Sequence, residues 1–578
     1  MKQLNGVKYI WQMPEIEQSA IAKLAATYNI SMPIAHTLLS RGLSDHDSIT
    51  SFLFSSFEKD VAHPSLMKDV HKAVDRLIYA IAQKESILIF GDYDVDGITS
   101  SALMMISLLP LGANVNFYLP NRMRDGYGLS TNIVERAAHN GYSVIVTVDN
   151  GITAFEPALR AKELGIDLII TDHHRPHESL PEAFAIVNPN QIDCEYPFKK
   201  LAGVGVTFKV LSLLYEQKGL KLPSKAYELL LLGTIADVVP LHGENRFWVR
   251  QGLNYINSVE SLSFKALKQN GKIAKPIISS LDIGFSIAPQ INALGRLQDP
   301  RQGVKFLIGA DELEVHEVGR ILFELNETRK EIERSIVAEI QQMIEMGVVD
   351  LELTIPIIAS SKKWPPGVIG LVASRLVSAY GRPTILLHET KEGLLKGSCR
   401  SIDGVNMFDL LQACRVHLEQ FGGHSQAAGL SLRKENLESF KQELQSLLVE
   451  RLTEDDLKQK IAVDADAKLQ DLNRKFIADL RLLEPFGCEN QQPLFYMKQV
   501  VSVQKPKLLK DAHVKCSIFA DGVIKPVIFF NRPDIYSLLI ANEHEPFSLV
   551  GQVQENHWNG RVNIELTGID VAFEKEIQ

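Results

Sequence analysis

The chain has 578 residues, which is too long for one small module and leaves room for several domains of ordinary size. Its 61 Lys and Arg residues against 70 Asp and Glu residues give a formal net charge of −9, so a nucleic-acid partner would have to meet a local groove rather than a basic surface. Hydrophobic residues at 45% and charged residues at 23% are ordinary for a globular protein and exclude a chain that is disordered throughout.

Short helical patterns fill the N-terminal segment. Val70 to Ala82 spaces its apolar residues three and four apart, and Ser40 to Ser44 has the composition of a turn. We therefore expect a helical N-terminal cap over residues 1–80.

Apolar strands alternate with helical stretches from Ser86 onward. Three β-branched runs are prominent, namely Ile87–Phe90, Val144–Val148 and Leu168–Thr171. Because parallel strands need helical crossovers, this alternation predicts an α/β fold with a parallel sheet covered by helices on both faces. Ligands of such sheets bind beyond the carboxyl ends of the strands, so the residues after each run are candidates for chemistry.

The second half of the chain begins with one long helical pattern. It runs from about residue 310 to 347 without proline, and at 1.5 Å per residue it would span about 50 Å and connect two lobes. A smaller α/β segment follows from Ile355, and short strands after Ile461 suggest a small β-barrel. The expected boundaries are 1–80 for the cap, 81–305 for the parallel-sheet domain, 306–350 for the connecting helix, 351–455 for the second α/β domain and 456–578 for the barrel.

Carboxylates crowd the end of the first apolar run. Asp92, Asp94 and Asp96 occupy alternate positions, and in extended backbone such side chains project to one side. Three carboxylates pointing the same way repel one another unless a divalent cation lies between them. A single acidic tip of this kind is equally compatible with a helix cap or a loop turn.

Further ligand-type side chains follow the later runs. Asp149 follows the second run, His173 and His174 follow the third, and Asp237 follows the helical run Tyr227–Ala236. Oxygen ligands with a minority of imidazole favour Mg²⁺ or Mn²⁺ over zinc. Two such ions would clamp the attacking and leaving oxygens of a phosphate ester.

The five cysteines are scattered without a CxxC pair. This fits neither a disulfide framework nor a structural zinc site and favours a reducing, cytoplasmic compartment. The chain shows no signal-peptide layout and no apolar stretch of about 18 residues, so we expect neither a membrane span nor a membrane partner.

Four motifs in order carry a family resemblance. GDYDVDG at 91–97, VDNG at 148–151, DHH at 172–174 and ADVVPL at 236–241 resemble the DHH phosphoesterase superfamily, and GGHSQAAG at 422–429 resembles its companion DHHA1 domain. Over nearly its whole length the chain is similar to the RecJ family of single-strand-specific 5′→3′ DNA exonucleases. The resemblance implies a DHH domain, a connecting helix, a DHHA1 domain and a C-terminal OB-like nucleic-acid-binding barrel.

The same resemblance implies a two-metal centre with Mn²⁺ or Mg²⁺. Asp149 would bridge the ions and take part in catalysis, and His174 would bind the scissile phosphate or assist the leaving group. The alternative for His174 is a histidine that orients a metal ligand. The implied metal ligands are Asp92, Asp94, Asp96, Asp149, His173 and Asp237, of which Asp92 is carried over only by its place in the motif.

Residues outside this cluster are implied to hold substrate. Guanidinium groups suit phosphate oxygens, although each arginine taken alone could be an ordinary surface residue. Residues 495–532 hold seven basic against two acidic side chains, with Phe519, Phe529 and Phe530 interleaved, as a single-strand-binding OB-fold needs. Each phenylalanine alone could equally belong to the barrel core. The implied substrate-binding residues are Arg122, Arg296, Ser398, Arg400 and His424.

Other segments fit known motifs less well. The Gly203–Phe208 segment lacks the third glycine of a dinucleotide fingerprint, and the chain has no GxxxxGK[ST] motif of a P-loop NTPase. Glu489 and Gln491 stand where members of the family usually carry a further glycine and proline, which puts the local turn in doubt.

The function implied by the resemblance is hydrolysis of single-stranded DNA from its 5′ end to 5′-mononucleotides in DNA repair and recombination. Single-strand-binding protein and a helicase are possible partners by family analogy. One alternative is a DHH-type small-substrate phosphodiesterase acting on oligonucleotides or dinucleotides, against which the basic barrel counts. The other is a non-catalytic DNA-binding scaffold, against which the retained set of metal-ligand residues counts.

Overall fold

The protein divides into two compact units. In a computed structural model, residues 2–121, 126, 128–558 and 561–573 are described. The smaller unit comprises Met1–Met13, Glu324–Ala462 and Ala572–Gln578, and the larger unit comprises Pro14–Phe323 and Val463–Val571. None of the helices in the described ranges is long and apolar enough to cross a membrane.

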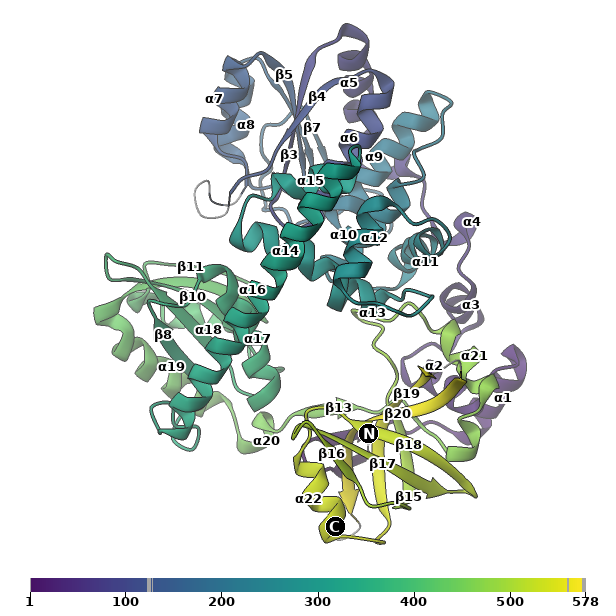
Figure 1. The fold of residues 1–578 in the computed structure, drawn as a ribbon. Coiled ribbons are helices and arrows are strands. Elements are labelled where there is room, and N and C mark those ends of the chain that lie inside the picture. The colour runs from purple at the N-terminus through teal and green to yellow at the C-terminus, as the bar shows by residue number, and fades with distance from the viewer. Residues whose placement is uncertain (1, 122–125, 127, 559–560, 574–578) are drawn as a thin grey trace. The chain divides into compact units, whose positions relative to one another are not determined.

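A five-stranded parallel sheet forms the centre of the larger unit, in the order β4-β3-β5-β6-β7 (Figure 1). The three runs expected as strands are β3, β5 and β6, which confirms the parallel sheet. The two edge strands were not predicted. The strands are β3 (Ser86–Gly91), β4 (Asn114–Tyr118), β5 (Tyr142–Val148), β6 (Asp167–Thr171) and β7 (Ala185–Val187).

Helices cover both faces of this sheet, which explains why the strands are apolar on both sides. α7 (Thr131–His139) and α8 (Phe155–Glu163) pack on one face against buried residues that include Leu88, Phe90 and Ile145. The other face is covered by α5 (Val70–Gln83), α6 (Val95–Leu108) and α9 (Gly203–Gln217).

Further helices of the larger unit follow the sheet in the chain. They are α10 (Ala226–Ala236), α11 (Gly243–Ser258), α12 (Leu262–Asn270), α13 (Ser280–Asp282), the π-helix η3 (Ile283–Ile287), α14 (Ala288–Leu297) and α15 (Arg301–Ile308).

The N-terminal segment is helical only in part. Its helices are α1 (Gln18–Tyr28), α2 (Met32–Ser40), α3 (His46–Phe54), α4 (Phe57–Asp60) and the α5 helix named above. Before them, β1 (Lys2–Asn5) and β2 (Ile10–Met13) form an antiparallel pair, which corrects the expectation of a cap that is helical from residue 1. β2 also pairs with β13 (Lys460–Ala462), and the side chain of Trp11 is fully buried, so this short sheet is part of the smaller unit.

The smaller unit is built on a second sheet, in the order β11-β12-β10-β9-β8. Its strands are β8 (Ile357–Ser361), β9 (Thr384–Glu389), β10 (Leu394–Arg400), β11 (Gln420–Gly423) and β12 (Ala427–Arg433). α17 (Pro366–Tyr380) packs on β9 and β10, and α18 (Met407–Ala413) and α19 (Leu437–Arg451) contribute to the core cluster with Leu395 and Cys399. The long helix α16 (Glu312–Glu345) has 34 residues, confirming the predicted connecting helix, and continues from the larger unit into the smaller.

The C-terminal sheet has the order β14-β15-β19-β20-β18-β17-β16 and closes in part through an added pairing of β15 with β17. This confirms an OB-like barrel. Its strands are β14 (Ala465–Asp466), β15 (Phe495–Ser502), β16 (Lys507–Leu509), β17 (His513–Ala520), β18 (Val523–Phe529), β19 (Phe547–Trp558) and β20 (Arg561–Phe573), with helices α21 (Arg474–Leu482) and α22 (Asp534–Ala541).

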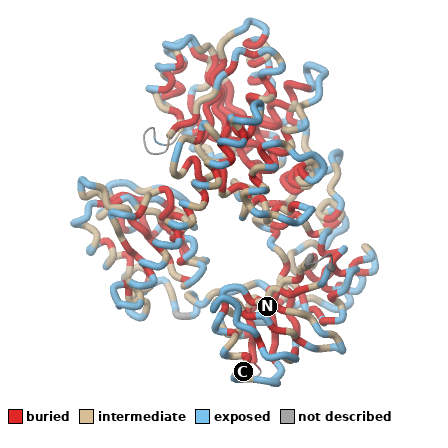
Figure 2. Tube along the Cα trace, viewed as in Figure 1, coloured by how far each residue is buried: buried red, intermediate tan, exposed pale blue. Residues whose placement is uncertain are grey.

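Some residues counted toward a nucleic-acid face of the barrel point inward. Phe529 is fully buried, whereas Phe519 and Phe530 are exposed. Arg532 is buried and pairs with Asp534 at 2.7 Å and with Asp570 at 3.1 Å. Buried residues fill the interior of the barrel, as they do in the two α/β layers (Figure 2).

Three arginines hold the segment 482–491, which connects α21 with the barrel strands. Arg246 donates to the carbonyl oxygens of Leu482 and Leu483 at 2.9 and 3.0 Å. Arg250 donates to the Glu484 carbonyl at 3.0 Å, and Arg41 to the Gln491 carbonyl at 2.8 Å. The course of this segment is thus fixed through its main chain.

Candidate metal centre

The first acidic segment lies where β3 passes into α6. Asp94 is the N-cap of α6, and its carboxylate accepts a hydrogen bond from the Gly97 amide at 3.1 Å. A Cβ on Gly97 would overlap the backbone of Asp92, so only glycine fits here. The acidic loop is therefore folded tightly over the helix N-terminus, whose N–H groups stabilise negative charge.

The Asp96 carboxylate is buried against the N-terminus of α9. The amides of Gly203 and Val204 donate to its two oxygens at 2.6 and 2.8 Å. Burial and the nearby charge of Asp94 nevertheless raise the pKa of Asp96 to about 7. The Asp96 carboxylate is thus held in a fixed orientation, but the two amides do not compensate for its burial and for the nearby negative charge.

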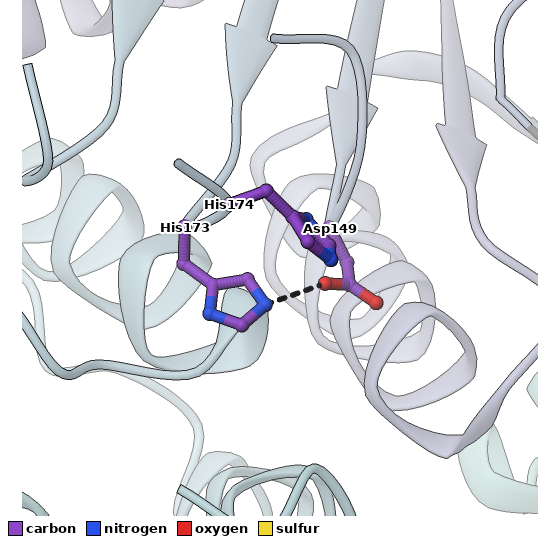
Figure 3. Close-up of side chains that lie close together, drawn as sticks. All are labelled: Asp149, His173 and His174. Atoms are coloured by element: carbon purple, nitrogen blue, oxygen red, sulfur yellow. Dashed lines mark ion pairs between the residues drawn. The ribbon is translucent and has the colours of Figure 1, made fainter. Parts of the chain in front are cut away.

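Asp149 and His173 meet at the ends of β5 and β6, beside His174 (Figure 3). His173 Nε2 lies 3.2 Å from Asp149 Oδ1 and 3.6 Å from Asp237 Oδ2. It lies 4.0 Å from an oxygen of Asp96, so four separate segments of the chain deliver side chains to one point. The sequence predicted the convergence of Asp96, Asp149 and His173 from the strand ends, and added Asp237 from the end of a helical run.

The donor set fits divalent cations. Three groups have their ligand atoms within 4.8 Å of one another, and Asp149 belongs to two of them. Among the residues that the structure describes, Asp149 Oδ1, His173 Nε2 and Asp237 Oδ2 are buried without a hydrogen-bond partner. Because buried polar atoms are nearly always satisfied, these three atoms indicate a site that fits a cation. The groups are Asp92, Asp94 and Asp149; Asp96, His173 and Asp237; and Asp149, His173 and His174.

The electrostatics of the cluster lead to the same conclusion. Burial, with the charges of Asp96 and Asp94, raises the pKa of Asp149 well above its ordinary value. Burial, with the charge of Asp96, raises that of Asp237 in the same way. Burial, with the charge of His174, lowers the pKa of His173 to about 4, which keeps its imidazole neutral as metal binding requires. Divalent cations would remove the repulsion among the carboxylates.

His174 is oriented by Asp172. The Asp172 carboxylate lies 2.7 Å from His174 Nδ1 and accepts hydrogen bonds from the backbone amides of His173 and His174. Burial lowers the pKa of His174, but the hydrogen bond and charge of Asp172 outweigh it and raise that pKa to about 9. Nδ1 is thus occupied by Asp172, and the ring of His174 is half-exposed. Asp172 was absent from the predicted site, although its place in the DHH motif was a signal.

Arg296 lies on a helix that packs against the acidic loop. In α14, the Asn292 side chain accepts a hydrogen bond from the Val95 amide at 3.3 Å. A Cβ on Gly295 would overlap the Tyr93 carbonyl oxygen, so helix and loop are in close contact. Arg296 is therefore positioned in the same unit as the candidate metal ligands. Arg122, predicted to bind substrate, lies outside the described residues.

Ser398, Arg400 and His424 belong to the smaller unit. Ser398 and Arg400 project from one side of β10, with Arg400 Nη1 3.3 Å from Ser398 Oγ. His424 is exposed and lies in the turn between β11 and β12, where its amide donates to the Ala427 carbonyl at 2.8 Å. The adjacent Gly423 has φ 137° and no space for a Cβ, so the hairpin itself requires this glycine.

Three segments match known domain families. Residues 86–234 match the DHH family, N-terminal domain, residues 353–450 match the DHHA1 domain, and residues 463–570 match the RecJ OB domain. The first two matches cover the two α/β sheets, and the third covers the C-terminal barrel.

Known proteins with the whole architecture are also similar. The chain is 36% identical over 569 residues to the single-stranded-DNA-specific exonuclease RecJ of Bacillus subtilis (strain 168), covering 98% of this chain and 71% of that protein. The crystal structure of RecJ from Thermus thermophilus in complex with Mn²⁺ matches with a TM-score of 0.81 and 26% identity, covering 97% of this chain and 79% of that one. The same protein in complex with Mg²⁺ matches with a TM-score of 0.76 and 24% identity, covering 97% and 78%.

Proposed function

The chain belongs to the RecJ family of single-stranded-DNA-specific exonucleases, and from this membership we propose that it hydrolyses single-stranded DNA from the 5′ end and releases 5′-mononucleotides. It is a phosphodiesterase that depends on divalent cations, Mn²⁺ or Mg²⁺, and it has a role in DNA repair and recombination. The observation that carries the proposal is the convergence of buried, unpartnered carboxylate and imidazole atoms at the ends of β5, β6 and α10.

We assign the ligands of two ions to the acidic cluster. The shared membership of Asp149 in two ligand groups supports a bridging position for this residue. When bound, the ions activate the attacking water and neutralise charge on the phosphate ester. The proposed ligands are Asp92, Asp94, Asp96, Asp149, His173 and Asp237.

His174 would act on the substrate phosphate. Asp172 holds its Nδ1 at 2.7 Å and favours the protonated ring, so Nε2–H is available as a donor. A donor at this position would stabilise negative charge on the phosphate or pass a proton to the leaving oxygen.

We further propose that the segments of the chain have separate roles. The segment 81–305 would carry out the chemistry, 351–455 would bind the strand, and 456–578 would track it, with 1–80 as a cap and 306–350 as the connection. Arginines at 122 and 296 would contact phosphates in the first of these segments. Ser398, Arg400 and His424 would bind the strand near its 5′-phosphate in the second.

A cytoplasmic location is proposed because all five cysteines are unpaired in the structure. Single-stranded DNA is the substrate partner. Single-strand-binding protein and a helicase are proposed as protein partners by analogy with the family.

The test is a product analysis with DNA labelled at either end. A 40-mer with 5′ label should release labelled mononucleotide at once in Mn²⁺, whereas a 3′ label should stay in long products until late. Duplex DNA of the same sequence should be degraded far more slowly. Immediate release from the 3′ end, or a preference for dinucleotides over the 40-mer, would contradict the proposal.

A further inference from the structure

An apolar pocket of about 730 Å³ lies within the larger unit. Its walls come from the end of α10, from η3 and α14, and from the segment around residues 486–492. The described residues that line it include none with a formal charge; among them are Ile235, Val238, Phe285, Asn292, Phe486 and Gln491.

The pocket adjoins the candidate metal centre on two sides. Val238 directly follows Asp237, whose Oδ2 lies 3.6 Å from His173 Nε2. On another wall, Asn292 accepts a hydrogen bond from the Val95 amide, between Asp94 and Asp96. The pocket therefore lies beside any phosphate held at the metal centre.

Two departures from regular backbone expose apolar side chains at the pocket. Val238 has φ 59°, a strained conformation for a β-branched residue, and is 65% exposed. Phe285 lies in the π-helix η3 and is 81% exposed. Strained residues and π-helical turns are concentrated at functional sites, and both features here present apolar surface to the same pocket.

We infer that this pocket holds bases of the substrate strand beside the phosphate being cleaved, with Phe285 as the surface on which a base stacks. This inference rests on the proposed function. The uncharged lining suits the base and not the phosphate of a nucleotide, and it offers no cation to an acidic peptide. The lining also contains the side-chain amides of Gln491 and Asn292, which suit the polar edges of a base, although the Asn292 oxygen already accepts a hydrogen bond from the Val95 amide. Stacking of this kind accepts any base, as an exonuclease requires.

The experiment compares three variants on defined DNA. Phe285→Ala removes the ring, Phe285→Trp keeps an aromatic surface, and Phe54→Ala is a matched control, because Phe54 is also an exposed phenylalanine of this unit, at 52%, but does not line the pocket. The substrates are 5′-labelled 40-mers, either intact or with one abasic nucleotide at one of the first five positions. Rates of nucleotide release are measured in Mn²⁺ below saturating DNA.

On intact DNA, Phe285→Ala should lower kcat/KM about tenfold, the size expected for one lost stacking contact. Phe285→Trp should lose clearly less than Phe285→Ala because it keeps an aromatic surface, and Phe54→Ala should match the wild type. At one abasic position the wild type should slow to the rate of Phe285→Ala, because both lack the same contact. An intact-DNA rate of Phe285→Ala equal to that of the wild type would overturn the inference, as would an equal loss on every abasic substrate. Failure of the proposed function would be distinct, because the wild type itself would then not shorten the 40-mer.

Discussion

At the scale of single residues, Asp149 combines several costly features. It has φ 61°, it is 2% exposed, and it lies among carboxylates that raise its pKa. A left-handed conformation costs an aspartate some free energy, and so does a buried charge. A bound cation would offset the cost of the buried charge, and the left-handed backbone would hold the carboxylate in the orientation that the cation requires.

Replacing Asp149 by asparagine should abolish nuclease activity and leave the fold intact. Asparagine tolerates the left-handed conformation and preserves the shape of the side chain, so the change removes only the charge. Nucleotide release in Mn²⁺ should fall below detection, whereas binding of single-stranded DNA, measured by fluorescence anisotropy in Ca²⁺, should stay close to that of the wild type. Substantial remaining turnover would show that Asp149 does not hold the metal ions.

Replacing Asp172 by asparagine should lower activity about 10- to 100-fold, the usual effect of losing a residue that orients a ligand or catalytic group. Asp172 accepts hydrogen bonds from the backbone of both histidines and fixes the ring of His174. Because loss of its charge also lowers the pKa of His174, the alkaline limb of the pH–kcat profile should move to lower pH. A loss of activity with an unmoved profile would point to a disturbed fold instead.

At the scale of elements, the ends of the parallel strands made the site predictable. Asp96, Asp149 and His173 could be expected to converge because the carboxyl ends of parallel strands share one edge of a sheet. The strand runs β3, β5 and β6 were apparent from their buried, β-branched composition. Asp237 was predicted from its place after the helical run Tyr227–Ala236, and not from a strand end, because it ends a helix.

The contribution of α9 could not be predicted in this way. Gly203 and Val204 bind Asp96 across more than a hundred residues of sequence, and no local pattern reports such a contact. In the sequence, the glycine pair Gly203 and Gly205 matches only an incomplete dinucleotide motif. Its physical reason is space, because a Cβ on Gly203 would lie 2.6 Å from the Cβ of Asp149. Likewise, β1 and β2 have only four residues each, and strands this short give no clear pattern beside the helical pattern that follows them.

Replacing Gly203 by alanine should therefore distort the metal centre through direct contact with Asp149. The added methyl group should displace Asp149 or α9, lowering activity at least tenfold and raising the Mn²⁺ concentration needed for half-maximal rate. Gly205→Ala, in the same helix, is the control, since its Cβ would meet only side-chain atoms of Leu201 at 3.2 Å or more. Equal effects of the two changes would mean that the loss comes from the helix in general.

At the scale of the whole molecule, the buried acidic centre makes the free energy of unfolding depend on pH. Metal-free protein keeps several carboxyl groups buried close together, with pKa values above those of the unfolded chain. Between the two pKa values the native state holds more protons than the unfolded state, so the free energy of unfolding falls as pH rises.

This dependence should be visible in thermal melts. In EDTA, raising the pH from 5 to 7.5 should lower the melting temperature of the wild type relative to that of Asp149→Asn, because the variant lacks one titrating carboxyl group. His173 has a lowered pKa, so its contribution to the free energy of unfolding rises with pH. Because both proteins contain His173, comparing their melting temperatures removes this contribution and leaves that of Asp149. Mn²⁺ should raise the melting temperature of the wild type more than that of the variant. A difference that is constant with pH would contradict the raised pKa of Asp149.

The arginine contacts with segment 482–491 bear on how this chain tolerates change. Arg41, Arg246 and Arg250 bind carbonyl oxygens, which every amino acid supplies. Glu489 has φ 53°, a left-handed conformation that favours glycine, and these contacts hold the backbone on both sides of it. Changes of side chain along this stretch should therefore leave its course intact as long as the three guanidinium groups are kept, with Asn490 as the exception, because its side chain also binds Arg41.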